Sequence, residues 1–196
     1  MSGSVWFEEI DKALIKLFSE TVKIPNRKGD IVSVPVSMRR PDPDFKLEEY
    51  PAITIYNVFS RYNSFRKGVD FTIVDRDYEN SKVILEKGAV PMDLYYQFDF
   101  WSKTMEDANN MTLAWYSHFD RFFNLDVFDK DGVARSCYAV RSDILRKYDY
   151  VTGDSRIFHS TVKYKIQTVI DENITIEKPM VTTIHNSCNI IIDKEV

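Results

Sequence analysis

Residues Val90 to Phe123 read VPMDLYYQFDFWSKTMEDANNMTLAWYSHFDRFF and carry the two patterns that decide the fold. The first part has a two-residue period, typical of a strand with two different faces. One face holds Leu94, Tyr96, Phe98 and Phe100, and the other holds Tyr95, Gln97, Asp99 and Trp101. In the second part apolar residues recur every three or four positions, as on an amphipathic helix: Met105, Ala108, Met111, Trp115, Phe119 and Phe122. At the junction, Thr104 and Asp107 resemble a capping box.

Upstream of this stretch the pattern predicts one helix, two strands and a hairpin. The helix covers Val5–Val22 with a stripe of apolar residues, and the first strand covers Ile31–Arg39, where Pro35 indicates an edge or a bulge. Three prolines predict a loop over 40–51. A compact strand follows over Ala52–Phe59, then a loop over Ser60–Lys67, and a hairpin through Phe71–Val74 and Lys82–Leu85.

Downstream, two further hairpins complete the predicted sheet. Leu125–Phe128 and Ala134–Val140 flank an Asp-Gly turn signal, and Ile144–Val151 precedes the alternating strand Ile157–Ile170. The fold class is therefore α+β, a mostly antiparallel sheet packed by two main helices in two layers, with a projecting loop or hairpin and a C-terminal arm.

The chain has no internal repeat and no Gly- or Ser-rich linker, so residues 1–170 are expected to form a single α+β domain. Residues 171–196 form a C-terminal arm or extra strands. With only two short β-prone runs, around Ile174–Ile176 and Ile190–Ile192, this segment has too little apolar surface to fold alone. It pairs with its own sheet or adds a strand to a neighbouring molecule, and the sequence leaves both alternatives open.

Composition narrows the classes of function. The formal net charge is −4, which argues against a protein that coats nucleic acid. Aromatic residues make up 14% of the chain, which favours a sheet-rich core and allows Tyr or Trp at a subunit interface. Cys137 and Cys188 are expected to be free thiols, a disulfide between them remaining open. No apolar run approaches the length of a membrane span, and synthesis in a reducing cytoplasm fits.

A search for chemistry nominates no catalytic residue, no metal ligand and no cofactor. The three histidines, His118, His159 and His185, fall on a helix, a strand and the tail, and His118 is interpreted as structural. Glycine motifs for phosphate binding and nucleophile elbows are absent from the sequence. The run Asp129–Gly132 is a turn and not a calcium loop, because Tyr138 stands where the bidentate Glu would be.

Three strings resemble a family of bacteriophage tail-terminator or tail-completion proteins: PMDLYYQFDFWSK at 91–103, RRPDPDF at 39–45 and YPAITIY at 50–56. The resemblance covers about Ser33 to Val140 and rests on pattern and element order, without a catalytic signature. It implies a small α+β subunit that closes into a ring, usually a hexamer, at the head-proximal end of the tail, with the hairpin after Ala52–Phe59 as a projecting arm that reaches a neighbour.

What the resemblance implies is a structural protein of the virion, assembled in the host cytoplasm. It would cap the tail tube, end tail polymerisation and join the tail to the neck. Its partners would be further copies of itself, the tail tube protein, neck or connector proteins, and the sheath protein if the tail is contractile; DNA would pass through the lumen without specific binding. The alternatives are a baseplate or head-tail connector subunit, a small enzyme with a dispersed active site, and a monomeric binding module.

Composition and position, and no family motif, suggest residues for the contacts with other subunits. These are Arg40, Tyr62, Phe65 and Arg66 in the loop region, and Ile190, Ile191 and Ile192 in the tail. Tyr and Arg are enriched at interfaces, and exposed β-prone apolar runs are suited to adding a strand to another molecule.

Overall fold

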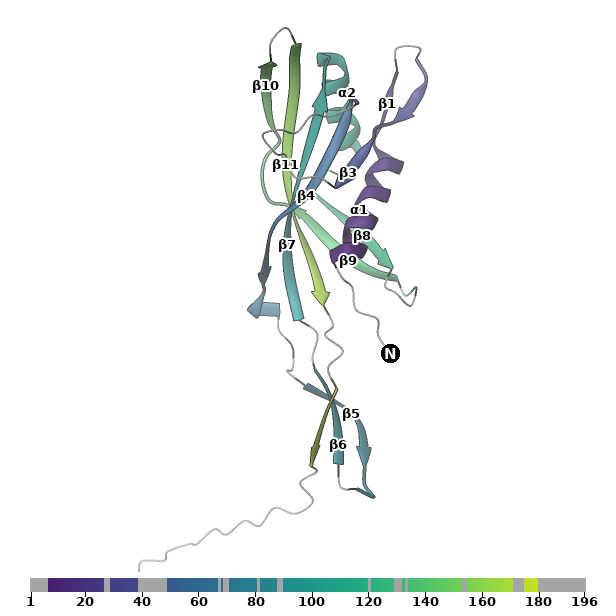
Figure 1. The fold of residues 1–196 in the computed structure, drawn as a ribbon, viewed down its shortest axis with the longest axis vertical. Helices are drawn as coiled ribbons and strands as arrows, with labels where there is room; N and C mark the ends of the chain where they lie inside the picture. Colours follow the sequence, from purple (N-terminus) through teal and green to yellow (C-terminus); the bar gives the residue numbers. More distant parts are fainter. Residues whose placement is uncertain are drawn as a thin grey trace, which may run out of the picture.

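The structure is a computed structural model that describes residues 7–26, 29–38, 49–66, 68, 71–80, 82–87, 90–119, 121–128, 132, 134–152, 155–170 and 175–179. Two helices cover one face of a large curled sheet, and a smaller sheet projects from one end of it (Figure 1). The α+β class predicted from the sequence is confirmed.

The large sheet has seven strands and is almost entirely antiparallel. Its order is β3-β4-β7-β11-β9-β8, with β10 paired to the first part of β11. Among the described strand pairs of this sheet, β3–β4 alone is parallel. The strands are β3 (Val36–Met38), β4 (Ala52–Tyr62), β7 (Val90–Ser102), β8 (Phe122–Phe128), β9 (Ala134–Arg141), β10 (Arg146–Thr152) and β11 (Ser155–Ile170).

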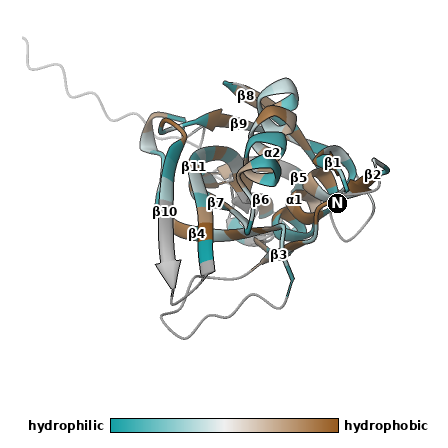
Figure 2. Cartoon of the chain, turned by 90° about the horizontal axis from the view of Figure 1, so that it is seen from above, coloured by the Kyte–Doolittle hydropathy of each residue, from teal (hydrophilic) through white to brown (hydrophobic). Residues whose placement is uncertain are grey.

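The two helices lie on the same face of this sheet, α1 (Phe7–Thr21) beside β8 and β3 and α2 (Met105–His118) beside β7 and β11 (Figures 1 and 2). Three turns of α1 bury Ile10, Leu14 and Phe18, and α2 buries Met111 and Trp115. These side chains pack on the face of β7 that the sequence predicted to be apolar: Leu94, Tyr96, Phe98 and Phe100 are all buried.

The start of α2 follows the predicted capping box. The Thr104 hydroxyl oxygen accepts a hydrogen bond from the backbone N–H of Asp107 (3.1 Å) and donates to the Asp107 carboxylate (2.6 Å). This satisfies one of the amide groups that a helix leaves unpaired at its N-terminus, and it places an acid in the positively polarised first turn.

The end of α2 differs from the prediction. The helix stops at His118, and Phe119 takes a non-helical conformation while its N–H bonds to the Trp115 carbonyl. Phe122, expected on the apolar stripe of the helix, lies in β8 with 60% of its surface exposed, whereas its neighbour Phe123 is buried. The period changes back to two at this point, so the strand alternation, and not the helical one, decides which side chain faces the core.

Two predicted boundaries upstream are also wrong. Residues 31–39 do not form one strand: β2 (Ile31–Ser33) pairs with β1 (Lys23–Pro25), and β3 pairs with β4. The break falls at Pro35, which has no N–H to donate and whose carbonyl accepts from Ile53. Residues 60–62, predicted as loop, continue β4 and pair with β7, after a bulge between Asn57 and Phe59.

The smaller sheet contains β5 (Phe71–Asp77), β6 (Lys82–Lys87) and β12 (Thr175–Pro179) in the order β12-β6-β5. The hairpin β5–β6 is the predicted one, extended by three residues in β5 and two in β6. Figure 1 shows this sheet, which we call the arm, projecting below the body. The tail residues 175–179 pair with β6 of the same chain, while Ile190, Ile191 and Ile192 lie outside the described residues.

The two cysteines differ in what the structure describes. Cys137 is a free thiol on β9, buried, with its Sγ 3.4 Å from the Thr168 hydroxyl. Burial raises the pKa of this thiol. Cys188 lies outside the described residues.

Candidate assembly surface

The lower end of β4 carries a short, exposed turn that is held rigidly by the sheet. After β4 the chain forms a 3₁₀ turn over Ser64–Arg66, and we call residues Tyr62–Arg66 the knob. The backbone N–H of Asn63 bonds to the Pro91 carbonyl (3.0 Å), and the N–H of Arg66 bonds back to the Asn63 carbonyl (3.2 Å). The knob is therefore tied to the beginning of β7.

The buried carboxylate of Asp93 accepts hydrogen bonds from two side chains of the knob. Asp93 on β7 is only 6% exposed and accepts from Asn63 Nδ2 at 3.0 Å and from Arg66 Nη1 at 3.3 Å. Lys165 Nζ lies 3.9 Å from the same carboxylate, and Arg66 Nη2 donates to the Thr168 carbonyl at 3.4 Å. Charge-assisted hydrogen bonds of this kind hold a side chain in one orientation.

This anchoring presents an aromatic side chain to the surroundings. Phe65, between Ser64 and Arg66 at the centre of the turn, is 99% exposed, and Tyr62 is 43% exposed. Next to them, Phe59 stacks on Tyr95 with ring centroids 4.2 Å apart. Because the backbone of the turn is already hydrogen-bonded, binding through Phe65 would not have to order it, which is typical of interface anchors.

The structure places the predicted interface residues as follows. Tyr62, Phe65 and Arg66 are brought together in the knob, while Arg40 and the three tail isoleucines lie outside the described residues. Sequence reasoning missed Asp93. An acid on the face of β7 opposite the core was the available signal, but its partner Arg66 is 27 residues away, and only the register between β4 and β7 joins them.

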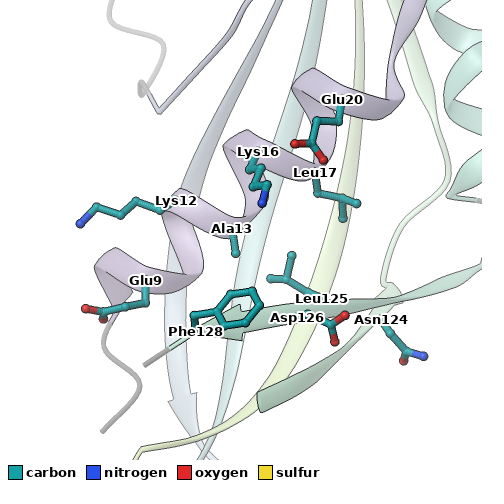
Figure 3. Close-up of a pocket in the computed structure, with 10 residues that line it drawn as sticks. All are labelled: Glu9, Lys12, Ala13, Lys16, Leu17, Glu20, Asn124, Leu125, Asp126 and Phe128. Carbon is teal, nitrogen blue, oxygen red and sulfur yellow. The ribbon is translucent and has the colours of Figure 1, made fainter. Parts of the chain in front are cut away.

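A second feature lies on the opposite flank of the body, a groove of about 440 Å³ between α1 and the edge strand β8. Figure 3 shows Ala13 and Leu17 pointing from α1 toward Leu125 and Phe128, which form the apolar floor. The remaining lining residues are polar: Glu9, Lys12, Lys16, Glu20, Asn124 and Asp126.

The rim of this groove has an excess of acid. It carries three carboxylates and two ammonium groups, and the ammonium of Lys12 lies 2.6 Å from Glu8, which does not line the groove. In Figure 3 the Lys12 side chain points away from the floor. The groove thus combines an apolar floor with a rim of mixed charge that includes the carboxylates of Glu20 and Asp126.

The helix-free face of the large sheet holds a buried polar cluster that the sequence did not reveal. Asp99 is fully buried, accepts from Gln97 Nε2 at 3.0 Å and lies 3.0 Å from His159 Nε2. Trp101 stacks on the His159 ring at 4.0 Å and donates its indole N–H to the Thr54 hydroxyl at 2.9 Å. These contacts link side chains of β4, β7 and β11, so the cluster stabilises the pairing of the three strands.

The described residues contain neither a cluster of metal-ligating side chains nor a membrane-spanning helix. No group of three or more His, Cys, Asp or Glu side chains there is arranged to hold a metal ion. Within the same residues, neither helix is long and apolar enough to cross a membrane.

Comparisons with known proteins find similarity in structure and none in sequence. No protein-family model matches the chain. No curated protein matches its sequence. Among solved structures, the fold is similar to the sheath/tube terminator of the extracellular contractile injection system PVC, determined by cryo-EM in the extended state.

That match has a TM-score of 0.51 at 10% sequence identity and covers 100% of this chain. The chain spans 66% of the length of that terminator. At this identity the likeness concerns the fold, so the chain has a tail-terminator-like fold.

Proposed function

We propose that this protein is a structural subunit that caps the tube of a contractile or phage-like tail and ends its polymerisation. The observation that carries the proposal is the fold similarity to a sheath/tube terminator over the whole described chain. The anchored aromatic knob and the projecting arm support it, because both offer surface to other molecules. In this proposal residues 1–170 form the single α+β domain, residues 171–196 form a C-terminal extension that supplies β12 to the arm, and the protein is not an enzyme and needs no cofactor.

The mechanism of capping is geometric. Identical subunits in head-to-tail contact form a closed ring when the rotation between neighbours divides a full turn, and a filament when it does not. We infer a hexameric ring, whose lower face matches the last ring of the tube. Its upper face does not repeat the tube's own edge, so no further tube subunit is added.

The partners follow from that position. The ring contacts the tail tube protein on one face and the sheath protein at its rim. In a phage it also contacts neck or connector proteins, it belongs to the virion, and it is assembled in the host cytoplasm. The net charge of −4 per copy favours a lumen through which DNA passes without specific binding. The proposal requires no membrane contact.

A second candidate is the terminator of an injection system that carries no DNA-filled head. The specific observation in its favour is that the similar structure is described as part of an extracellular contractile injection system. In that case the tube and sheath contacts remain and the neck contact is absent. A baseplate or connector subunit is the third candidate within the same class of structural proteins.

The test is capping of growing tubes. The protein is added to polymerising tube protein, tube lengths are measured by negative-stain electron microscopy, and the mass of the protein alone is measured by light scattering. The proposal expects shorter tubes that carry a ring of density at one end, and a ring mass near a sixfold multiple of the 23.0 kDa chain. Unchanged tube lengths and tube ends without added density would overturn it.

A further inference from the structure

We propose that the knob of one copy docks in the α1–β8 groove of the next copy, with the Phe65 ring on the apolar floor. The inference rests on the proposed function, because it describes the contact that would close the ring. It joins a protruding aromatic side chain that is 99% exposed and a recess on the surface of the described structure.

The positions of the two features fit a head-to-tail contact. The sheet is curled and α1 contacts both of its edge strands, β8 and β3, so the strand order alone does not separate the two features. Figure 1 shows the lower end of β4 at the left of the body and α1 with β8 at the right. β3 pairs with β4 at Ile53–Ile55, and among the described residues no strand pairs with the same edge of β4 farther toward the knob. A protrusion on one flank and a recess on the other form a heterologous interface, which generates rings or filaments and not isologous dimers.

The chemistry of the two features is complementary. Phe65 supplies an aromatic ring, and Ala13, Leu17, Leu125 and Phe128 supply an apolar floor. The volume of about 440 Å³ has room for a phenyl group and part of the adjacent turn. Arg61 is exposed and directly precedes the knob, and in the docked pair its guanidinium would face the carboxylates of Glu20 and Asp126 on the rim of the groove. Opposite charges at the rim set orientation and speed the encounter.

The knob is preorganised for this contact. Its hydrogen bonds to Asp93 and Pro91 exist in the single chain, so docking does not have to order the turn. Phe65 gains burial on docking without giving up an internal contact, because almost all of its surface is exposed beforehand. An exposed aromatic residue on a preorganised turn is typical of an interface anchor.

The experiment uses chemical crosslinking between two variants of the full chain. Ser64→Cys places a thiol in the knob next to Phe65, Asn124→Cys places one at the groove, and neither removes an aromatic ring. Both carry Cys188→Ser, and Cys137 is buried. The two proteins are mixed in equal amounts and treated with a short bis-maleimide. Asn109→Cys, on the exposed side of α2, replaces Asn124→Cys in the matched control.

The expected result is a crosslinked heterodimer whose yield falls about tenfold or more when Phe65→Ala is added to the Ser64→Cys chain. Arg61→Glu also lowers the yield, and Asp126→Arg on the other chain restores it. Phe122→Ala, a change of an exposed Phe on the same strand as the groove but outside its lining, leaves the yield unchanged.

Two results would overturn the proposal. One is a 64–124 yield no greater than the 64–109 control. The other is a crosslink that forms only after residues 180–196 are removed, which would make the tail the occupant of the groove. Tube capping is measured separately. Capping without the crosslink would support the proposed function and contradict this contact. The crosslink without capping would support the contact and contradict the proposed function.

Discussion

The ring of Phe18 lies flat against the ring of Phe119, with centroids 4.5 Å apart and planes inclined by 5°. Phe18 also stacks on Phe98 at 4.7 Å, so one side chain of α1 joins the end of α2 to the centre of β7. Because the Tyr164 hydroxyl donates to the Phe119 carbonyl, the end of α2 is also fixed to β11. The two layers of the body meet at this point.

Phe18→Ala should therefore destabilise the body strongly. It leaves a cavity among three aromatic rings, and we expect the free energy of unfolding to fall by about 3–5 kcal/mol. Urea denaturation followed by tryptophan fluorescence measures the change. Phe65→Ala is the matched control: the same substitution at a 99% exposed position should change the free energy of unfolding by less than about 0.5 kcal/mol. Similar losses for the two variants would contradict the placement of Phe18.

Thr104→Ala should weaken α2 at its start. The substitution removes the oxygen that accepts from the Asp107 N–H, and loss of such a cap costs about 1 kcal/mol. Thr112→Ala serves as control, because its hydroxyl bonds to the Ala108 carbonyl within the helix, and we expect a change within about 0.5 kcal/mol. Denaturant midpoints of the two variants, measured side by side, separate the outcomes.

Asp93→Asn should loosen the knob and destabilise the body moderately. The change removes the charge that Arg66 and Lys165 share, at a position where little water can replace it. We expect a loss of about 1–3 kcal/mol and faster amide hydrogen exchange at Asn63 and Arg66. Asp143→Asn, which removes a carboxylate partner of the exposed Arg146, should cost less than about 1 kcal/mol. Unchanged exchange in the knob would show that Asp93 does not hold it.

The pair Asp11–Tyr96 gives the protein a predictable pH dependence. Burial raises the pKa of Asp11 above its ordinary value, although the hydrogen bond from the Tyr96 hydroxyl (2.6 Å) opposes the rise. A folded pKa above the unfolded one means that the folded state binds this proton more tightly. The stability that this group contributes is therefore fully present below the unfolded pKa of about 3.9 and is lost as the pH rises through the folded pKa.

Asp11→Asn cannot titrate and should remove that loss. We expect the stability of the variant relative to the native protein to increase from about pH 4 upward and to level off above the folded pKa of Asp11. Urea denaturation at a series of pH values from about 4 to 7 measures it. A constant difference over the whole series would mean that Asp11 has the same pKa in both states.

Patterns within one element were sufficient to predict most of the body. The alternation in Leu94–Phe100 gave the buried face of β7, and the Thr104–Asp107 signal gave the start of α2, because both depend on neighbours within a few residues. The end of α2 was missed because Phe119 and Phe122 continue a helical spacing by coincidence. The chain leaves the helix at this point, and in that conformation Phe119 stacks on Phe18 while Phe123 packs against Phe119 from β8.

The candidate site depends on relations that periodicity does not contain. Arg66 and Asp93 meet only because β4 continues through Tyr62 and pairs with β7, while the polar composition of residues 60–67 indicated a loop. Composition did identify Phe65 and Tyr62 as interface residues for testing, but not the groove between α1 and β8, since its two walls are more than a hundred residues apart.

The arm draws its strands from two distant parts of the chain. β5 and β6 form a hairpin inserted between β4 and β7, and β12 follows β11, so that Lys82 and Glu177 pair across 95 residues (3.0 Å). A two-stranded hairpin alone is marginally stable in water. When β6 has been synthesised, the arm still lacks its third strand, β12. All strands of the body are synthesised before β12. The arm can therefore be completed only when every strand of the body is already present in the chain.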